Sequence, residues 1–267
     1  LELINNVGIP NMTIFITDSD KKLKGSLTDG DIRRGLLNGL VIGFPVTNFM
    51  NVSSKFFSDN ENNFSKARKY KALGIRFVPV LNSEKVIVNL IDLEKISSII
   101  PVDVVLMAGG KGERLKPLTD HIPKPMVKIG DEPIIIRNIN RLTNFGVSNF
   151  HISVRHMAEQ IESGVAEHIK DNIDIRFIKE DKPLGTIGSV KLISHFINDT
   201  VLLMNSDLLT NIDFEDFYNK FIETGSDFQV ATVPYYVDVP YAVMKINESE
   251  EVVSFSEKPR YTYFSTA

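Results

Sequence analysis

A glycine-rich segment in the middle of the chain holds the residues whose types and spacing best suit chemistry. Residues 108–115 read Ala-Gly-Gly-Lys-Gly-Glu-Arg-Leu and directly follow an apolar run. Glycines let the backbone approach a ligand closely and point several N–H groups at phosphate oxygens. The candidates for this contact are Ala108, Gly109, Gly110 and Gly112. A glycine cluster on its own is more often a plain tight turn, so the interpretation depends on its neighbours.

Two cations next to the loop favour phosphate binding. Arg114 follows the last glycine by two residues, and Lys124 stands between two prolines in Pro123-Lys124-Pro125. The prolines stiffen that segment, so little entropy is lost when the lysine is fixed. Arginine suits bidentate contacts with phosphate, and lysine supplies a point charge. Either cation alone would be a solvated surface residue, but loop and cations together predict a triphosphate site.

The loop matches neither of two common phosphate-binding patterns. A P-loop needs Gly-x4-Gly-Lys-Ser/Thr, and the chain contains no such string. A dinucleotide fingerprint needs Gly-x-Gly-x-x-Gly, and Leu115 stands where its third glycine should be. The sequence therefore predicts a phosphate loop of a different type.

Alternating strands and helices are expected to position this loop. The apolar run over 103–108 is typical of a buried parallel strand. Further strands are predicted over 149–154, 174–179, 200–204 and 227–234, and helical segments over 134–145, 158–170, 188–196 and 214–224. This alternation predicts an α/β fold with a Rossmann-like, mainly parallel sheet and helices on both faces.

Asp207 is the acidic residue best placed to act with the loop. It ends the run Asn205-Ser206-Asp207, directly after the predicted strand 200–204. In open parallel sheets, ligands bind at the carboxyl ends of the strands. We therefore expect Asp207 at the same sheet edge as the loop. The acidic residues of 213–216 are better interpreted as the polar start of a helix.

The residues from Leu106 to Thr119, followed by Pro123-Lys124-Pro125-Met126, resemble the signature of sugar-1-phosphate nucleotidyltransferases of the mannose-1-phosphate guanylyltransferase-like kind. The resemblance covers 103–267 and implies the nucleotide-diphospho-sugar transferase fold. It implies an enzyme that transfers a nucleoside monophosphate from a nucleoside triphosphate to a sugar 1-phosphate and releases pyrophosphate. The implied cofactor is Mg2+, held by Asp207. The implied catalytic residues are Arg114, Lys124, Asp207 and Lys258.

The run from Glu180 to Gly188, which includes Gly185, resembles the family's base-recognition loop. A carboxylate at Glu180 could accept the N1–H and the exocyclic amine of guanine. Uracil and thymine present both a donor and an acceptor, which would suit an amide better. The nucleotide favoured is therefore GTP, although Glu180 could also be a plain carboxylate at a strand end.

Glu257-Lys258-Pro259 is similar to the family's Glu-Lys-Pro segment. The resemblance implies that Glu257 contacts sugar hydroxyls and that Lys258 contacts the sugar phosphate. Tyr241 stands where relatives often have a Tyr/Gly-type pair near the sugar. Here Ala242 follows it, so the identity of the sugar is not predicted. A second metal-binding aspartate is expected after this segment. Because the chain ends first and lacks an initiator methionine, we expect it to be a fragment.

The first hundred residues show an approximate internal repeat. A strand–turn–strand–helix pattern over 13–38 is followed by a weaker copy over 77–98, with a helical segment over 63–73 between them. We expect a small α+β module over 1–100, joined with almost no linker to the transferase domain over 101–267.

Gly25 to Arg34 resembles the ribose-binding signature of CBS domains (cystathionine β-synthase type), which occur in tandem pairs. The resemblance implies a pair, incomplete in its first copy, that binds an adenine nucleotide and regulates the enzyme. The implied ligands are Thr28, Asp31 and Arg33, with Arg34 as an alternative to Arg33. In the second copy Ile91 and Glu94 replace the first two, so its site is expected to be empty. A helix N-cap without ligand, or a dimerisation module, stays open for the first copy.

Composition excludes several classes of function. A net charge of −4 gives no basic field for nucleic acid, and the absence of cysteine excludes disulfides and thiolate metal sites. No stretch approaches the roughly 20 apolar residues that span a bilayer, and the first residues do not form a signal peptide. We therefore expect a cytoplasmic protein without membrane or nucleic-acid partners. We also expect a homo-oligomer.

Two alternatives to a sugar nucleotidyltransferase stay open. The chain could be a non-catalytic adenine-nucleotide sensor with a degenerate transferase domain, although Arg114, Lys124, Asp207 and Lys258 are all present. It could instead transfer to a phosphoalcohol such as phosphocholine, although the intact Glu257-Lys258-Pro259 favours a sugar.

Overall fold

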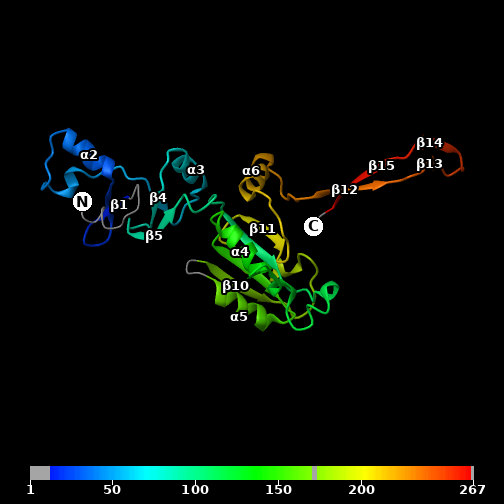
Figure 1. Ribbon diagram of the computed structural model, residues 1–267. Helices are drawn as coiled ribbons and strands as arrows, with labels where there is room; N and C mark the ends of the chain where they lie inside the picture. The colour runs from blue at the N-terminus through cyan, green and yellow to red at the C-terminus, as the bar shows by residue number, and fades with distance from the viewer. Residues whose placement is uncertain (1–12, 170–172, 266–267) are drawn as a thin grey trace. The chain divides into compact units, whose positions relative to one another are not determined.

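The structure is a computed structural model that describes residues 13–169 and 173–265. The chain divides into two compact units, which are described separately (Figure 1). The first ends at Glu215 and the second begins at Asp216.

The first unit begins with a hairpin and a helix. Strands β1 (Ile14–Thr17) and β2 (Leu23–Leu27) pair antiparallel, and helix α2 (Asp29–Leu37) follows. Thr28 is the N-cap of α2, because its side chain accepts a hydrogen bond from the Asp31 amide while the Asp31 carboxylate bonds back to the Thr28 amide. This capping box satisfies amides that a helix end leaves without partners.

Residues 46–92 form a small sheet with its own core. Its elements are η1 (Val46–Asn48), β3 (Phe57–Ser58), α3 (Phe64–Ala72), β4 (Phe77–Leu81) and β5 (Ile87–Asp92). The sheet order is β3-β4-β5, with β3 parallel and β5 antiparallel to β4. Phe57 and Tyr70 stack at 5.5 Å between ring centroids in this core. The amide of Leu23 donates to the Lys85 carbonyl (3.0 Å), which ties the two copies together.

The helical segment predicted over 92–98 is wrong, because these residues form a turn and a connector. The Asp92 carboxylate accepts hydrogen bonds from the Arg76 guanidinium and from the Glu94 amide, which fixes a turn. The connector is then held by bonds to the end of a later helix, such as that from the Ile100 amide to the Phe145 carbonyl (2.9 Å).

A four-stranded parallel sheet forms the centre of the first unit. Its strands are β6 (Val102–Met107), β9 (Asn149–Val154), β10 (Asp174–Lys179) and β11 (Thr200–Asn205), in the order β10-β9-β6-β11. The predicted strands in these places are confirmed. Val104, Val105 and Leu106 are fully buried, as expected for a strand covered on both faces.

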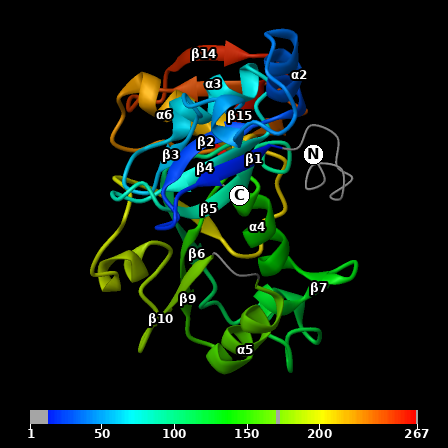
Figure 2. The same ribbon diagram turned by 90° about the vertical axis from the view of Figure 1, so that its left-hand side faces the viewer.

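Helices α4 (Ile134–Thr143) and α5 (Ala158–His168) lie on the same side of this sheet (Figure 2). They bury apolar side chains at helical spacing, with Ile135, Ile139 and Ile161 fully inaccessible. A short hairpin of β7 (Lys128–Ile129) and β8 (Glu132–Pro133) precedes α4. Two 3-10 turns, η2 (Glu113–Leu115) and η3 (Lys124–Met126), lie between β6 and that hairpin.

The helix predicted over 188–196 is replaced by a short 3-10 helix, η4 (Gly188–Leu192). The buried Asp103 carboxylate accepts hydrogen bonds from the Ile197 amide (2.5 Å) and from the Asn198 side chain (2.8 Å). These bonds hold the following residues in an extended path. An unpaired buried carboxylate would be costly, so this long-range contact overrides the local helical pattern.

The second unit is a helix followed by a long antiparallel hairpin. Helix α6 (Phe214–Thr224) leads into it, β12 (Val233–Asp238) pairs with β15 (Arg260–Ser265), and β13 (Val243–Ile246) pairs with β14 (Val252–Ser256). The strand predicted over 227–234 is wrong for most of its length. Residues 227–232 are irregular instead, and the Gln229 side chain donates to the Phe217 carbonyl of α6 (2.8 Å). Within 13–169 and 173–265, no helix is long and apolar enough to cross a membrane.

Candidate active site

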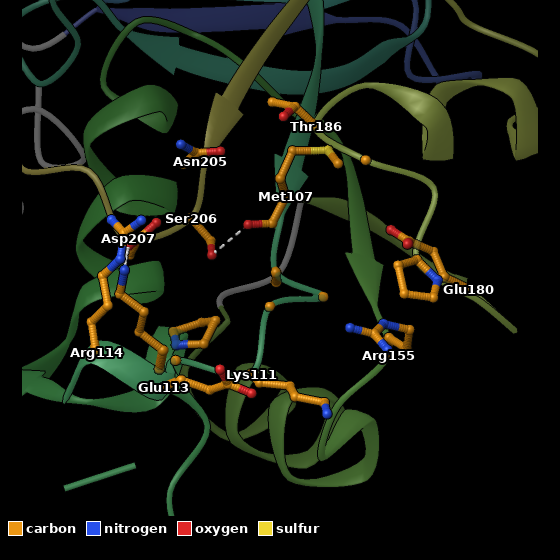
Figure 3. Close-up of a pocket in the computed structure, with 18 of the residues that line it drawn as sticks. Met107, Lys111, Glu113, Arg114, Arg155, Glu180, Thr186, Asn205, Ser206 and Asp207 are labelled. Carbon is orange, nitrogen blue, oxygen red and sulfur yellow. Dashed lines mark hydrogen bonds and ion pairs between the residues drawn. The ribbon is translucent and has the colours of Figure 1, made fainter. Parts of the chain in front are cut away.

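A cavity of about 610 Å3 lies at the carboxyl ends of the four parallel strands (Figure 3). Each strand contributes lining residues from the segment that follows it. The contributors are the 108–115 loop after β6, Arg155 after β9, Glu180 after β10 and Asp207 after β11. The cavity therefore lies where parallel α/β sheets bind ligands, next to the point where the strand order reverses.

Gly112 is required where the loop folds against the lysine segment. Its φ of +68° lies in the left-handed region, and its carbonyl accepts a hydrogen bond from the Thr119 hydroxyl (2.8 Å). A Cβ at this position would lie 3.1 Å from Cβ of Lys124, closer than ordinary van der Waals contact. Glycine thus allows both the backbone conformation and the approach of Lys124 to the loop.

Lys124 and Asp207 form an ion pair across the cavity. Asp207 is held next to the central strand, because the amide and hydroxyl of Ser206 donate to the Met107 carbonyl at 3.1 and 2.8 Å. Both charged side chains remain partly exposed, 37% for Lys124 and 24% for Asp207. A phosphate that enters can bond to the ammonium, and a cation can then take its place at the carboxylate.

Glu180 is a buried acceptor, only 8% exposed. The Ser153 hydroxyl donates to its Oε1, and the Leu184 amide lies 3.4 Å from its Oε2. Ser153 is fully buried on β9, so the carboxylate is held in one orientation toward the cavity. A fixed carboxylate of this kind can accept hydrogen bonds from a ligand that presents adjacent N–H groups.

The structure brings most of the predicted residues together at this cavity. Ala108, Gly109, Gly110, Gly112, Arg114, Lys124, Glu180, Gly185 and Asp207 all line it. Polar residues that we did not predict lie with them: Lys111, Glu113, Arg155 and Thr186 line the cavity, and Ser153 orients Glu180. Arg155 follows β9 directly, so the rule that indicated Asp207 would also have indicated it.

The donor set suits a cation that also binds phosphate. The described residues hold no group of three or more His, Cys, Asp or Glu side chains that could bind a metal alone. Mg2+ is usually bound through one or two carboxylates, with substrate phosphates and water as further ligands. Asp207 provides one such carboxylate, with Asn205 beside it at the cavity wall.

The predicted sugar-binding residues lie in the second unit. Glu257, Lys258 and Pro259 form the turn between β14 and β15, where Lys258 has a φ of +41°. Tyr241 lies in the connection between β12 and β13 and is 75% exposed. Their roles stay predictions.

The predicted regulatory residues in the first unit bond to one another. The Thr28 hydroxyl donates to Asp31 (2.7 Å), Arg34 pairs with Asp31 (2.6 Å), and Arg33 pairs with Asp29 (2.8 Å). Partial burial would raise the pKa of Asp31, but the bonds from Thr28 and Arg34 outweigh it and lower the pKa. These contacts are those of a helix N-terminus.

The parallel sheet, with its loop and cations at the carboxyl edge, defines an open α/β protein of the kind that binds phosphorylated ligands. The nucleotidyl transferase family model matches residues 103–266, so the chain belongs to the nucleotidyl transferase family.

The chain is also similar to several individual proteins. The chain is 30% identical over 161 residues to "Bifunctional protein GlmU" of Methanococcus aeolicus, covering 60% of this chain and 36% of that protein. It is 29% identical to "Mannose-1-phosphate guanylyltransferase catalytic subunit beta" of Xenopus tropicalis, covering 58% and 45%. The crystal structure of HddC from Yersinia pseudotuberculosis is 31% identical, with a TM-score of 0.47 over 62% of this chain and 73% of that one. The chain thus spans less than half the length of these two curated relatives.

Proposed function

We propose that this protein transfers a nucleoside monophosphate from a nucleoside triphosphate to a sugar 1-phosphate and releases pyrophosphate. The observation that carries the proposal is one cavity lined by the glycine loop, Arg114, Lys124 and Asp207, in a chain of the nucleotidyl transferase family. The names of similar proteins, which include a mannose-1-phosphate guanylyltransferase, support a sugar phosphate as the acceptor.

In this proposal the sugar phosphate attacks the α-phosphorus in line. A phosphate oxygen is already anionic at neutral pH, so the protein needs no general base. Its residues act by positioning and by stabilising charge. The loop amides and Arg114 hold the leaving pyrophosphate, and Lys124 stabilises charge as the transfer proceeds. The role of Lys258 toward the incoming phosphate stays what the family resemblance implies.

Asp207 would hold Mg2+. When bound, the ion would neutralise phosphate charge. Lys124 pairs with Asp207 in the structure, so a phosphate that draws the ammonium away would leave the carboxylate available to the ion.

The favoured nucleotide is GTP. The Glu180 carboxylate is buried, and the Ser153 hydroxyl and the Leu184 amide orient it as an acceptor. Guanine presents two adjacent donors, N1–H and the exocyclic amine, that a carboxylate can accept together.

The test is pyrophosphate release by the intact protein with Mg2+, using four nucleoside triphosphates against a panel of sugar 1-phosphates and phosphocholine. Turnover with GTP is the expected result. Turnover with UTP, CTP or dTTP instead would keep the class and reject the base assignment. No release from any pair by the folded protein would favour the sensor alternative, and release with phosphocholine alone would favour a phosphoalcohol acceptor.

Regulation by adenine nucleotide at the front module stays a prediction. The capping box at Thr28 and Asp31 supports the structural interpretation of that motif, because its polar groups already bond to each other.

A further inference from the structure

We infer that Arg155 is a second base-reading residue, which contacts the O6 and N7 edge of guanine while Glu180 contacts the N1 and amine edge. The inference rests on the proposed function and deepens it. No sequence motif indicated Arg155, which comes from the far end of the cavity relative to the phosphate-binding cations.

Arg155 and Glu180 are direct neighbours at the ends of adjacent strands. Val154 and Lys179 are paired in register between β9 and β10, and each candidate residue follows one of them. The Glu180 amide also donates to the Val154 carbonyl (3.0 Å). Both side chains border the same point of the glycine loop, because a Cβ on Gly109 would lie 3.4 Å from Oε1 of Glu180 and 3.5 Å from Cβ of Arg155.

The sheet order separates these two residues from the phosphate end of the cavity. Going along the carboxyl edge, Glu180 follows β10, Arg155 follows β9, the glycine loop follows β6 and Asp207 follows β11. Three strand spacings separate the outer two strands, which is roughly 14 Å. Figure 3 likewise shows Arg114 and Asp207 on one side of the cavity, with Glu180 and Arg155 on the other. A nucleotide with its phosphates on the loop therefore directs its base toward Arg155.

The chemistry of the pair matches guanine more closely than other bases. An arginine fork donates to O6 and N7 of guanine in a bidentate contact. Adenine presents an amine donor in place of O6, which repels the guanidinium, and pyrimidines have no N7. Among the described residues, the Glu180 carboxylate accepts from the Ser153 hydroxyl and the Leu184 amide, and no ion pair joins it to Arg155.

The test measures equilibrium binding to the chain, with Mg2+, of GTP, of 7-deaza-GTP, which lacks N7, and of ITP, which lacks the 2-amine. The unchanged chain is expected to bind 7-deaza-GTP about tenfold more weakly than GTP. Arg155→Gln should bind both equally, yet still distinguish GTP from ITP. Glu180→Gln should bind GTP and ITP equally, yet still bind 7-deaza-GTP more weakly than GTP. Lys182→Gln, which removes a nearby exposed positive charge that does not line the cavity, is the matched control and should behave as the unchanged chain.

Other results would overturn the inference. If Arg155→Gln weakened GTP, ATP, UTP and CTP by the same factor, Arg155 would be a phosphate contact. If GTP were preferred but Arg155→Gln left the affinity ratio of GTP over 7-deaza-GTP unchanged, the role of Arg155 would be wrong and the guanine assignment would stand. If the unchanged chain preferred another nucleotide, the guanine assignment itself would fail. Arg155→Lys keeps the positive charge but lacks the two parallel donors of the guanidinium. If this variant bound GTP as well as the unchanged chain but did not discriminate against 7-deaza-GTP, Arg155 would act only through its charge.

Discussion

At residues 108–115 the loop, together with Arg114 and Lys124, lines a cavity, whereas at residues 25–34 the polar groups of a second nucleotide-like motif bond to one another. In the first segment the strand runs into the glycine loop at the cavity, and only the last residues, Glu113–Leu115, form a 3-10 turn. In the second, Thr28 and Asp31 form the N-terminus of α2 and satisfy its amides.

The difference shows that a polar motif becomes a ligand site only where the fold leaves its hydrogen-bonding groups available. Hydroxyls and carboxylates at a helix N-cap lower the free energy of the helix itself. At the carboxyl edge of the parallel sheet Lys111 and Arg114 line the cavity, and the ion pair of Lys124 with Asp207 is partly exposed there, so these charges face the place where a ligand enters.

Lys124→Ala should lower kcat by about a hundredfold, because losing one preorganised cation costs on the order of 3 kcal/mol in the barrier. Steady-state kinetics with GTP and the best sugar 1-phosphate would measure the change. Lys116→Ala, which removes an exposed lysine outside the cavity, should leave kcat unchanged. Equal turnover in wild type and Lys124→Ala would remove Lys124 from the reaction.

Glu180→Gln should shift the ratio of kcat/KM for GTP over UTP by roughly tenfold toward UTP, because an amide offers both a donor and an acceptor. Competition between the two nucleotides in one reaction would measure the ratio. The neighbouring exposed Asp181→Asn serves as the control and should not move it. An unchanged ratio in Glu180→Gln would make Glu180 a structural carboxylate at the end of β10.

Thr28→Ala should lower the free energy of unfolding by about 1 kcal/mol through loss of the N-cap, with no effect on nucleotidyl transfer. Urea denaturation measures the first quantity, and Thr28→Ser, which keeps the cap, should restore it. If Thr28→Ala were as stable as wild type but were no longer stabilised by ATP, as wild type was, Thr28 would be a nucleotide ligand and not only a helix cap.

His151 should make the first unit less stable as the pH falls below about 6.5, the ordinary histidine pKa. Burial lowers the pKa of His151, opposed by Asp103 and Asp174, and its Nδ1 has no hydrogen-bond partner among the described residues. The unfolded chain therefore takes up a proton that the folded chain resists, so stability is lost as the pH falls toward the folded pKa. Unfolding of His151→Gln between pH 5 and 8 should show a shallower slope, and an equal slope would contradict this.

The sequence predicted the parallel strands and the loop because these depend on local patterns. The apolar run at 103–108 and the strands at 149–154 and 174–179 lie where expected. The helix at 188–196 failed because Asp103, far away in the chain, binds the amides of Ile197 and Asn198. No local pattern reports a contact of that range.

The site residues that belong to local sequence motifs were predicted, and those that depend on contacts between strands were not. Arg114, Lys124, Glu180 and Asp207 belong to motifs, and the structure places them around one cavity. Ser153 and Arg155 belong to no motif. The position of Arg155 after a predicted strand could have indicated it, but the contact of Ser153 with Glu180 appears only when β9 and β10 are paired in register.

Hydrogen–deuterium exchange of the chain with and without GTP and Mg2+ tests most directly that the cavity, and not the front motif, holds the nucleotide. The account predicts slower exchange in peptides covering 108–115 and 180–187, with no change over 25–37. Protection confined to 25–37, with the glycine loop unaffected, would contradict it.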